Sequence, residues 1–119
     1  MSACLEKEDV VSLSGASLDE STERLREVSP DQCVVFVLEA QSLERQLLHT
    51  YRIVTVCTKK EDDLNRVADW WKTMTDICDS YAKNLQNLHK QHPHCGADFY
   101  YDRVLDLRNK CQRLQEMHR

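Results

Sequence analysis

Residues 61–92 read EDDLNRVADWWKTMTDICDSYAKNLQNLHKQH. Apolar side chains recur in this stretch at alternating steps of three and four residues: Leu64, Val67, Trp71, Met74, Cys78, Tyr81, Leu85 and Leu88. This spacing puts them on one face of an α-helix, while the charged and amide residues between them fall on the other face. A helix with an apolar stripe four heptads long needs further helices to bury it.

Two other stretches have the same alternation. The earlier one consists of Cys33, Phe36, Ala40, Leu43, Leu47, Thr50, Val54 and Cys57. The later one consists of Ala97, Tyr100, Val104, Leu107, Cys111, Leu114 and His118. Because three striped helices can bury their stripes against each other within one chain, the sequence predicts an all-α fold. We expect an antiparallel three-helix bundle, or coiled coil, over residues 30–119, with helices at about 30–57, 60–92 and 97–118.

The predicted helix ends have recognisable signals. Ser29-Pro30-Asp31-Gln32 combines an N-cap, a proline at the first helical position and an acid in the first turn. Thr58-Lys59-Lys60-Glu61 has the form of a capping box and would start the second helix. Pro93 ends that helix at His92, and Gly96 allows the chain to reverse. The third stripe continues to Arg119 without a cap, as expected of a shortened product or a piece of a longer chain.

Two alternatives remain open at this point. Residues 33–38 and 53–57 are rich in valine and isoleucine, so they could form β-strands. Alternatively, the signal at Thr58 lacks glycine and proline, and one helix about 95 Å long could run from Pro30 to His92. In that case the stripes would form a dimeric coiled coil.

The composition fits a single helical domain. Among 119 residues there are two glycines and two prolines, with 41% hydrophobic and 30% charged residues. No apolar run is long enough to span a membrane, and the N-terminus has no signal-peptide pattern. We therefore expect a cytoplasmic or nuclear protein whose six cysteines are reduced, several of them serving as small apolar residues of the stripes.

Residues 1–29 form an acidic, serine-rich stretch with few large apolar side chains. They carry seven acidic and three basic groups, whereas residues 30–119 carry thirteen of each. This composition predicts a disordered tail. Since no basic face is present anywhere, we expect neither a nucleic-acid nor a membrane partner.

Two features of this tail could have a role. Val10, Val11 and Leu13 lie beside acidic residues in a pattern that resembles a SUMO-interacting motif, which implies a β-strand added to the sheet edge of a partner. Ser17 and Ser29 resemble acidic-directed and proline-directed phosphorylation sites. A phosphate at Ser29 would lie at a predicted helix N-terminus, where its negative charge is favourable.

The candidate for metal chemistry is a cluster at the end of the second predicted helix. His89, His92, His94 and Cys95 offer four nitrogen and sulfur donors within seven residues, the donor types that zinc prefers. A polar loop between helices explains the same residues. No arrangement of a nucleophile with a base or of convergent acids is apparent, so we expect neither an enzyme nor a bound cofactor.

The aromatic residues suggest contacts with a partner protein. Trp70 lies beside the stripe, and Ile77 follows it two turns later, so together they could form an exposed apolar edge. A third helix could equally cover that edge. Phe99 and Tyr101 start the third predicted helix, where aromatic residues either fix a loop onto a bundle or contact a partner.

Three heptad-patterned helices joined by short turns resemble a spectrin-type repeat over residues 30–119. The pattern departs from that family in its tryptophans, because the family places a core tryptophan in the first helix and both tryptophans here fall in the second. The resemblance implies a scaffold or spacer that binds other proteins. The sequence thus favours a non-enzymatic interaction module with a regulated tail and homodimerisation as one mode of assembly; the alternative is a small metal-binding or redox protein.

Overall fold

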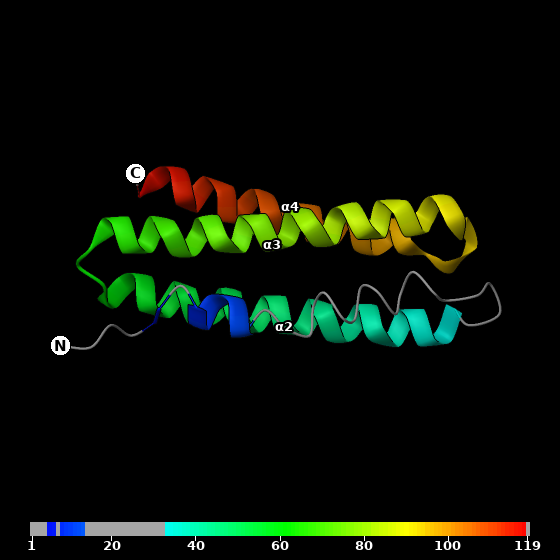
Figure 1. The fold of residues 1–119 in the computed structure, drawn as a ribbon, viewed down its shortest axis with the longest axis horizontal. Coiled ribbons are helices and arrows are strands. Elements are labelled where there is room, and N and C mark those ends of the chain that lie inside the picture. Colours follow the sequence, from blue (N-terminus) through cyan, green and yellow to red (C-terminus); the bar gives the residue numbers. More distant parts are fainter. Residues whose placement is uncertain (1–4, 7, 14–32, 119) are drawn as a thin grey trace.

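The computed structural model describes residues 5–6, 8–13 and 33–118. Three long helices, α2 (Cys33–Lys60), α3 (Leu64–Gln91) and α4 (Ala97–Met117), run antiparallel, and the short 3₁₀ helix η2 (Pro93–Cys95) joins the last two (Figure 1). These described residues include no β-strand, and residues 33–38 and 53–57 are helical. The predicted all-α bundle is therefore confirmed, and the strand alternative is wrong for both segments.

The three predicted stripes form the core. In α2 the stripe from Phe36 to Cys57 is buried throughout, and in α4 it is buried from Ala97 to Cys111. In α3 every stripe residue is buried except Leu64, which is 56% exposed. Leu64 is the first residue of its helix, so it lies at the end of the bundle, beyond the neighbouring side chains.

The chain breaks between α2 and α3, so the continuous-helix alternative is wrong. Asp63 caps α3, and its Oδ1 accepts hydrogen bonds from the backbone N–H groups of Asn65 and Arg66 at 3.0 and 3.4 Å. Thr58, which the capping-box prediction made the N-cap, instead donates its hydroxyl to the Val54 carbonyl at 2.7 Å. An aspartate five residues further along therefore starts the helix, and the predicted capping box is not formed.

The helices pack unequally. α3 and α4 lie side by side along the length of α4 (Figure 1), and Arg108 Nε on α4 donates to Asp79 Oδ1 on α3 at 2.8 Å. α2 contacts this pair through aromatic edges at two levels: Tyr51 with Trp71 at 5.5 Å and Phe36 with Tyr100 at 6.1 Å between ring centroids.

Part of the N-terminal stretch packs on the bundle. Residues 8–13 are helical, and the side chains of Leu5 and Val10 are buried in the core at 4% and 0% exposure. Glu6 accepts a hydrogen bond from Arg66 of α3 at 2.8 Å. Two apolar side chains and one ion pair therefore attach residues 5–6 and 8–13 to the helices, and the rest of the predicted tail lies outside the described residues.

Candidate functional site

The turn between α3 and α4 brings most of the chemically distinctive side chains together. The backbone N–H of His92 caps α3 by donating to the Leu88 carbonyl at 2.7 Å. Pro93 then opens η2, and Gly96 reverses the chain with a φ of +81°. Glycine suits this left-handed conformation because it has no Cβ. The turn therefore places His92, His94 and Cys95 at one end of the bundle, beside the start of α2.

A disulfide closes this end. Cys33 at the start of α2 is bonded to Cys95 of η2 across 62 residues of sequence, with a Cα–Cα distance of 5.2 Å. Cys57, at the other end of α2, is disulfide-bonded as well. The expectation that all cysteines are reduced is wrong for these three residues. Cys33 and Cys95 are joined because the start of α2 meets η2 in space. We call the end that carries the Cys33–Cys95 bond the disulfide end.

The predicted metal cluster is only partly assembled. Ligand atoms of Cys33, His94 and Cys95 lie within 4.8 Å of one another, so the structure adds Cys33 to the predicted set. His92 is next to this group, with its ring in an edge contact with His94 at 6.4 Å. His89 lies one turn earlier on α3. Since both sulfurs are in a disulfide, neither is available here as the thiolate that zinc binds.

The imidazoles of His89 and His92 share an unusual feature. Each has a buried Nδ1 atom that forms no hydrogen bond within the described part of the chain. Both side chains are nevertheless only half-buried. An imidazole nitrogen can bind a metal or accept a hydrogen bond, but because both Nδ1 atoms are buried, neither is open to a ligand in this arrangement of the side chains.

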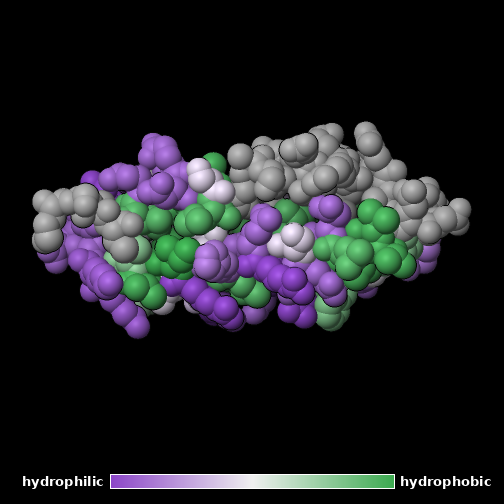
Figure 2. All heavy atoms as spheres, turned by 90° about the horizontal axis from the view of Figure 1, so that it is seen from below, coloured by the Kyte–Doolittle hydropathy of each residue, from purple (hydrophilic) through white to green (hydrophobic). Residues whose placement is uncertain are grey.

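Exposed apolar side chains gather near the disulfide end. Val34, Val35 and Leu38 of α2 are 73%, 51% and 61% exposed, and Figure 2 shows one group of apolar residues toward this end of the molecule and another toward the opposite end. We call these three residues the α2 apolar surface. Phe99, at the start of α4, is 55% exposed and carries the Arg103 guanidinium over its ring at 5.2 Å. Together they give this end several uncovered apolar side chains.

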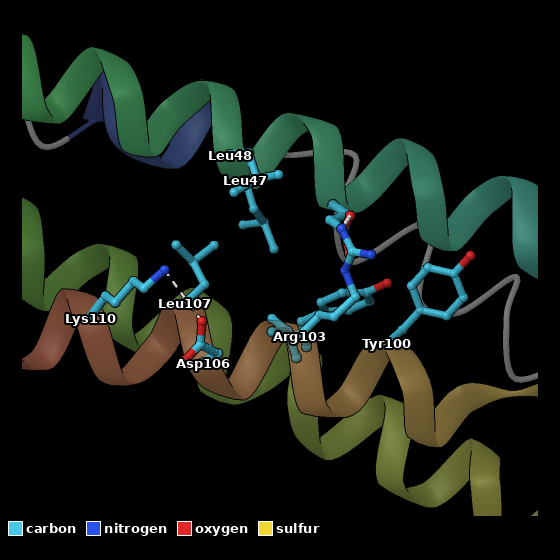
Figure 3. A pocket seen from close by; sticks show the side chains of 10 residues that line it. Leu47, Leu48, Tyr100, Arg103, Asp106, Leu107 and Lys110 are labelled. Carbon is cyan, nitrogen blue, oxygen red and sulfur yellow. Dashed lines mark hydrogen bonds and ion pairs between the residues drawn. The ribbon is translucent and has the colours of Figure 1, made fainter.

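A cavity of about 170 Å³ lies between α2 and α4 (Figure 3). Its apolar wall consists of Leu47, Leu48, Val104 and Leu107. Its charged rim consists of Glu44, Arg103, Asp106 and Lys110. These four are paired, Arg103 with Glu44 at 2.6 Å and Lys110 with Asp106 at 3.3 Å. The charges at the mouth of the cavity are therefore already neutralised.

Tyr81 closes the inner side of this cavity. Its side chain is 1% exposed, and its hydroxyl forms no hydrogen bond within the described residues. Burial raises the pKa of Tyr81 well above its usual value, and the nearby Glu44 and Tyr100 add to this. The hydroxyl is therefore neutral, and Tyr81 belongs to the lining of a small cavity.

The aromatic residues predicted to contact partners are divided between core and surface. Trp70 is 0% exposed, so the expectation that Trp70 and Ile77 form an exposed apolar edge is wrong for Trp70. Trp70 borders a hollow that it shares with Glu6, Arg66 and Asp69. Ile77 and Tyr101 are half-buried against the core. Phe99 is the one predicted aromatic contact that is clearly exposed.

The aliphatic residues of the tail lie on a short helix in the unbound chain. Residues 8–13 are helical and Val10 is fully buried, whereas Val11 and Leu13 are 45% and 36% exposed. A helix with its central valine in the core cannot add a β-strand to the sheet edge of a partner without first unfolding. Ser17 and Ser29, the predicted phosphorylation sites, lie outside the described residues.

No family model, curated protein or solved structure matches the chain.

Proposed function

We propose that this protein is a non-enzymatic protein–protein interaction module, with its binding face at the disulfide end. The observation that carries the proposal is the α2 apolar surface, where Val34, Val35 and Leu38 stay exposed on a helix whose opposite face is buried. Neighbouring exposed apolar side chains are typical of binding surfaces. A rigid helical end fixed by a disulfide would present them with little loss of conformational entropy on binding.

The partner that suits this surface is another protein presenting an apolar helical face. Val34 and Leu38 are four residues apart on α2, the spacing at which two helices interlock. Residues 30–119 carry thirteen acidic and thirteen basic groups, which does not favour a nucleic acid or an anionic membrane. A spectrin-like scaffold role and a homodimer are both forms of this proposal.

A surface variant with a matched control tests the proposal. Val34→Gln with Leu38→Gln replaces two of the three side chains of the α2 apolar surface, while Val56→Gln changes a valine that is 51% exposed at the far end of the same helix. Glutamine keeps the helix propensity high in both. We expect proteins that co-purify with the unmodified chain to be lost from the double variant and retained by Val56→Gln. Equal retention by both variants would contradict the proposal.

Self-association is tested with the same variants. Light scattering on the unmodified chain gives its solution mass. A dimer that dissociates in the Val34→Gln/Leu38→Gln variant would identify the partner as a second copy of the chain. A dimer that persists in this variant would place the contact elsewhere on the bundle.

Regulation of the proposed module would come from the N-terminal stretch. Ser29 precedes Cys33, the first described residue of α2, by four residues, so a phosphate there would be close to the α2 apolar surface in sequence. Ser17 lies among acidic residues that favour an acidic-directed kinase. Phosphorylation would add negative charge near the surface and change its affinity for a partner.

A small metal-binding or redox protein is the second candidate function. It is favoured by the three ligand atoms of Cys33, His94 and Cys95, which lie within 4.8 Å of one another. Reduction of the disulfide by two equivalents of a thiol would give two cysteine thiols, and zinc would displace their protons. His92, beside His94, is the natural fourth ligand for a tetrahedral site.

A zinc titration distinguishes the two functions. With the thiols reduced, the metal function predicts tight binding of one zinc ion with release of protons, and loss of this binding in His94→Ala. The interaction function predicts no dependence of partner binding on zinc. Absence of tight binding in the reduced protein would remove the metal candidate.

The two functions also imply different compartments. Among the described residues no helix combines the length and the hydropathy needed to cross a bilayer. A reduced, metal-binding form would belong in the cytoplasm or nucleus, as expected from the sequence, whereas the Cys33–Cys95 bond would persist in an oxidising compartment.

A further inference from the structure

α3 and α4 each contribute one cysteine to the same level of the bundle. Cys78 and Cys111 are both 0% exposed, and they are the two free cysteines of the described residues. The hydrogen bond from Arg108 to Asp79 at 2.8 Å sets the register of the two antiparallel helices at this level. In that register Cys78, next to Asp79, lies opposite Cys111, one turn after Arg108, and both side chains are buried between the two helices.

The surroundings of this pair do not suit a metal ion. Within the described ranges, the group of ligand atoms that could hold one is that of Cys33, His94 and Cys95, which does not include the pair. Asp79, the adjacent carboxylate, is already paired with Arg108. Two thiols alone supply too few ligands for a tetrahedral zinc site. Their mutual contact in an apolar layer leaves covalent pairing as the chemistry open to them.

We propose that Cys78 and Cys111 are a site of oxidative modification at which a disulfide-bearing oxidant, such as glutathione disulfide, joins α3 to α4. The reaction consumes two cysteine thiols and one oxidant disulfide, and it yields the Cys78–Cys111 disulfide and two thiols of the oxidant. It proceeds in two exchanges through a mixed disulfide, and both protons pass to the departing thiolates.

The state of the other cysteines supports this modification. Cys33 and Cys95 are already joined, and Cys57 is also disulfide-bonded. Surroundings that oxidise these residues also supply the oxidant that the Cys78–Cys111 pair requires. The Cys78–Cys111 bond would join the middle of two packed helices, whereas the Cys33–Cys95 bond joins the start of α2 to the turn before α4.

The timing of the reaction follows from burial. The thiolate is the attacking species, and the hydrogen bond to Cys111 together with burial raises the pKa of the Cys78 thiol. Asp79 adds to this rise, while Arg108 opposes it. In the closed bundle the pair is therefore protonated and shielded from an oxidant. The exchange takes place while α3 and α4 are still apart, as the chain folds.

Peptide mapping of the unmodified chain tests the proposal directly. The protein is reduced, unfolded and refolded with a mixture of reduced and oxidised glutathione, and remaining thiols are alkylated in denaturant. Trypsin then cuts without reduction. We expect residues 73–83, which contain Cys78, to be joined to residues 111–113, which contain Cys111. The linked peptides 27–45 and 91–103 report the Cys33–Cys95 bond in the same digest.

Two results would overturn the proposal. One is recovery of residues 73–83 and 111–113 as separate alkylated peptides from protein in which the Cys33–Cys95 peptides are linked. The other is a link from Cys78 or Cys111 to any different cysteine. Because the chain is unmodified, neither result can be attributed to a variant that fails to fold.

A double-mutant cycle provides a second readout. Cys78→Ala, Cys111→Ala and the double variant are refolded as above, and their melting temperatures are compared. A shared cross-link predicts that each single change lowers the melting temperature on the order of 10 °C and that the second change adds little. Two separate packing effects would add, and additive losses would overturn the proposal.

Discussion

α2 and α3 have the same length but different roles in the bundle. Each has 28 residues, and α3 buries eleven of them while α2 buries seven. α3 packs along α4 and also contacts α2, so residues outside its stripe, such as Trp70, Thr73 and Ala82, are covered too. α2 keeps the α2 apolar surface and Val56 uncovered. α3 is therefore the structural centre, and α2 has the free surface.

Specific contacts attach α2 to the rest of the bundle. Its first residue is held by the Cys33–Cys95 disulfide, and its middle is held by Tyr51 against Trp71 and by the Glu44–Arg103 ion pair. A cavity separates it from α4 beside that ion pair. Changes at these attachments should affect α2 more than the α3–α4 pair, and the predictions below test this difference.

The largest expected effect is at Trp71, where α2 and α3 meet. Trp71→Ala should lower the free energy of unfolding by about 4 kcal/mol, because it removes a fully buried ring and leaves a cavity. Urea unfolding measures the loss. Leu38→Ala, a truncation on the exposed face of α2, should cost less than about 0.5 kcal/mol. Similar losses in the two variants would contradict the distinction between the two helices.

Removing the disulfide should have the next largest effect. The double change Cys33→Ala with Cys95→Ala should lower the free energy of unfolding by about 3 kcal/mol, the middle of the range that removal of a disulfide typically costs. Hydrogen exchange should then speed up most in the first turns of α2, whose attachment is lost. An equal increase in the exchange rate across α3 and α4 would mean that α2 does not unfold locally more easily than the other helices.

The helices and their buried faces could be predicted from the sequence because hydrophobic periodicity is a local property. The spacing of apolar residues from Val67 to Leu88 predicted the face of α3 that is buried in the structure. The cap at Asp63 was missed because Thr58 and Asp63 are both good N-caps, and the choice depends on the length of loop that the two helices need.

The site could not be predicted to the same extent because it depends on pairs distant in sequence. His94 and Cys95 were recognised as metal-type donors, but Cys33 joins them only because the start of α2 meets the turn before α4. Likewise, the burial of Trp70 follows from the central place of α3. Two adjacent tryptophans on one helix were the available signal that a second face is covered.

A smaller effect is expected at the turn that forms the disulfide end. Gly96→Ala should cost about 1 kcal/mol, because an L-residue is strained at a φ of +81° although a Cβ there would meet no atom within 4 Å. Gly96→Asn should cost less, since asparagine tolerates this conformation better. Thermal unfolding measures both variants. Equal losses would indicate a steric cause in place of a conformational one.

The smallest effect is expected at Tyr81, which faces the cavity between α2 and α4. Tyr81→Phe should change the free energy of unfolding by less than about 1 kcal/mol at neutral pH, and in the stabilising direction, because it removes a buried hydroxyl that has no hydrogen-bond partner among the described residues. Tyr101→Phe is the matched control, since its ring is only half-buried. A clear loss of stability in Tyr81→Phe would show that the hydroxyl is hydrogen-bonded in solution.

The dependence of stability on pH separates the contribution of Tyr81 from that of other groups. Burial raises the pKa of Tyr81 in the folded chain above its ordinary value of 10.0, so the folded state holds this proton more tightly than the unfolded state. The sign follows from linkage: this contribution is complete below about pH 10 and is lost as the pH rises further. Urea unfolding between pH 8 and pH 11 should show a steeper fall in the unmodified chain than in Tyr81→Phe. Parallel curves would mean that Tyr81 ionises as easily in the bundle as in the unfolded chain, which would require α2 to open away from the cavity.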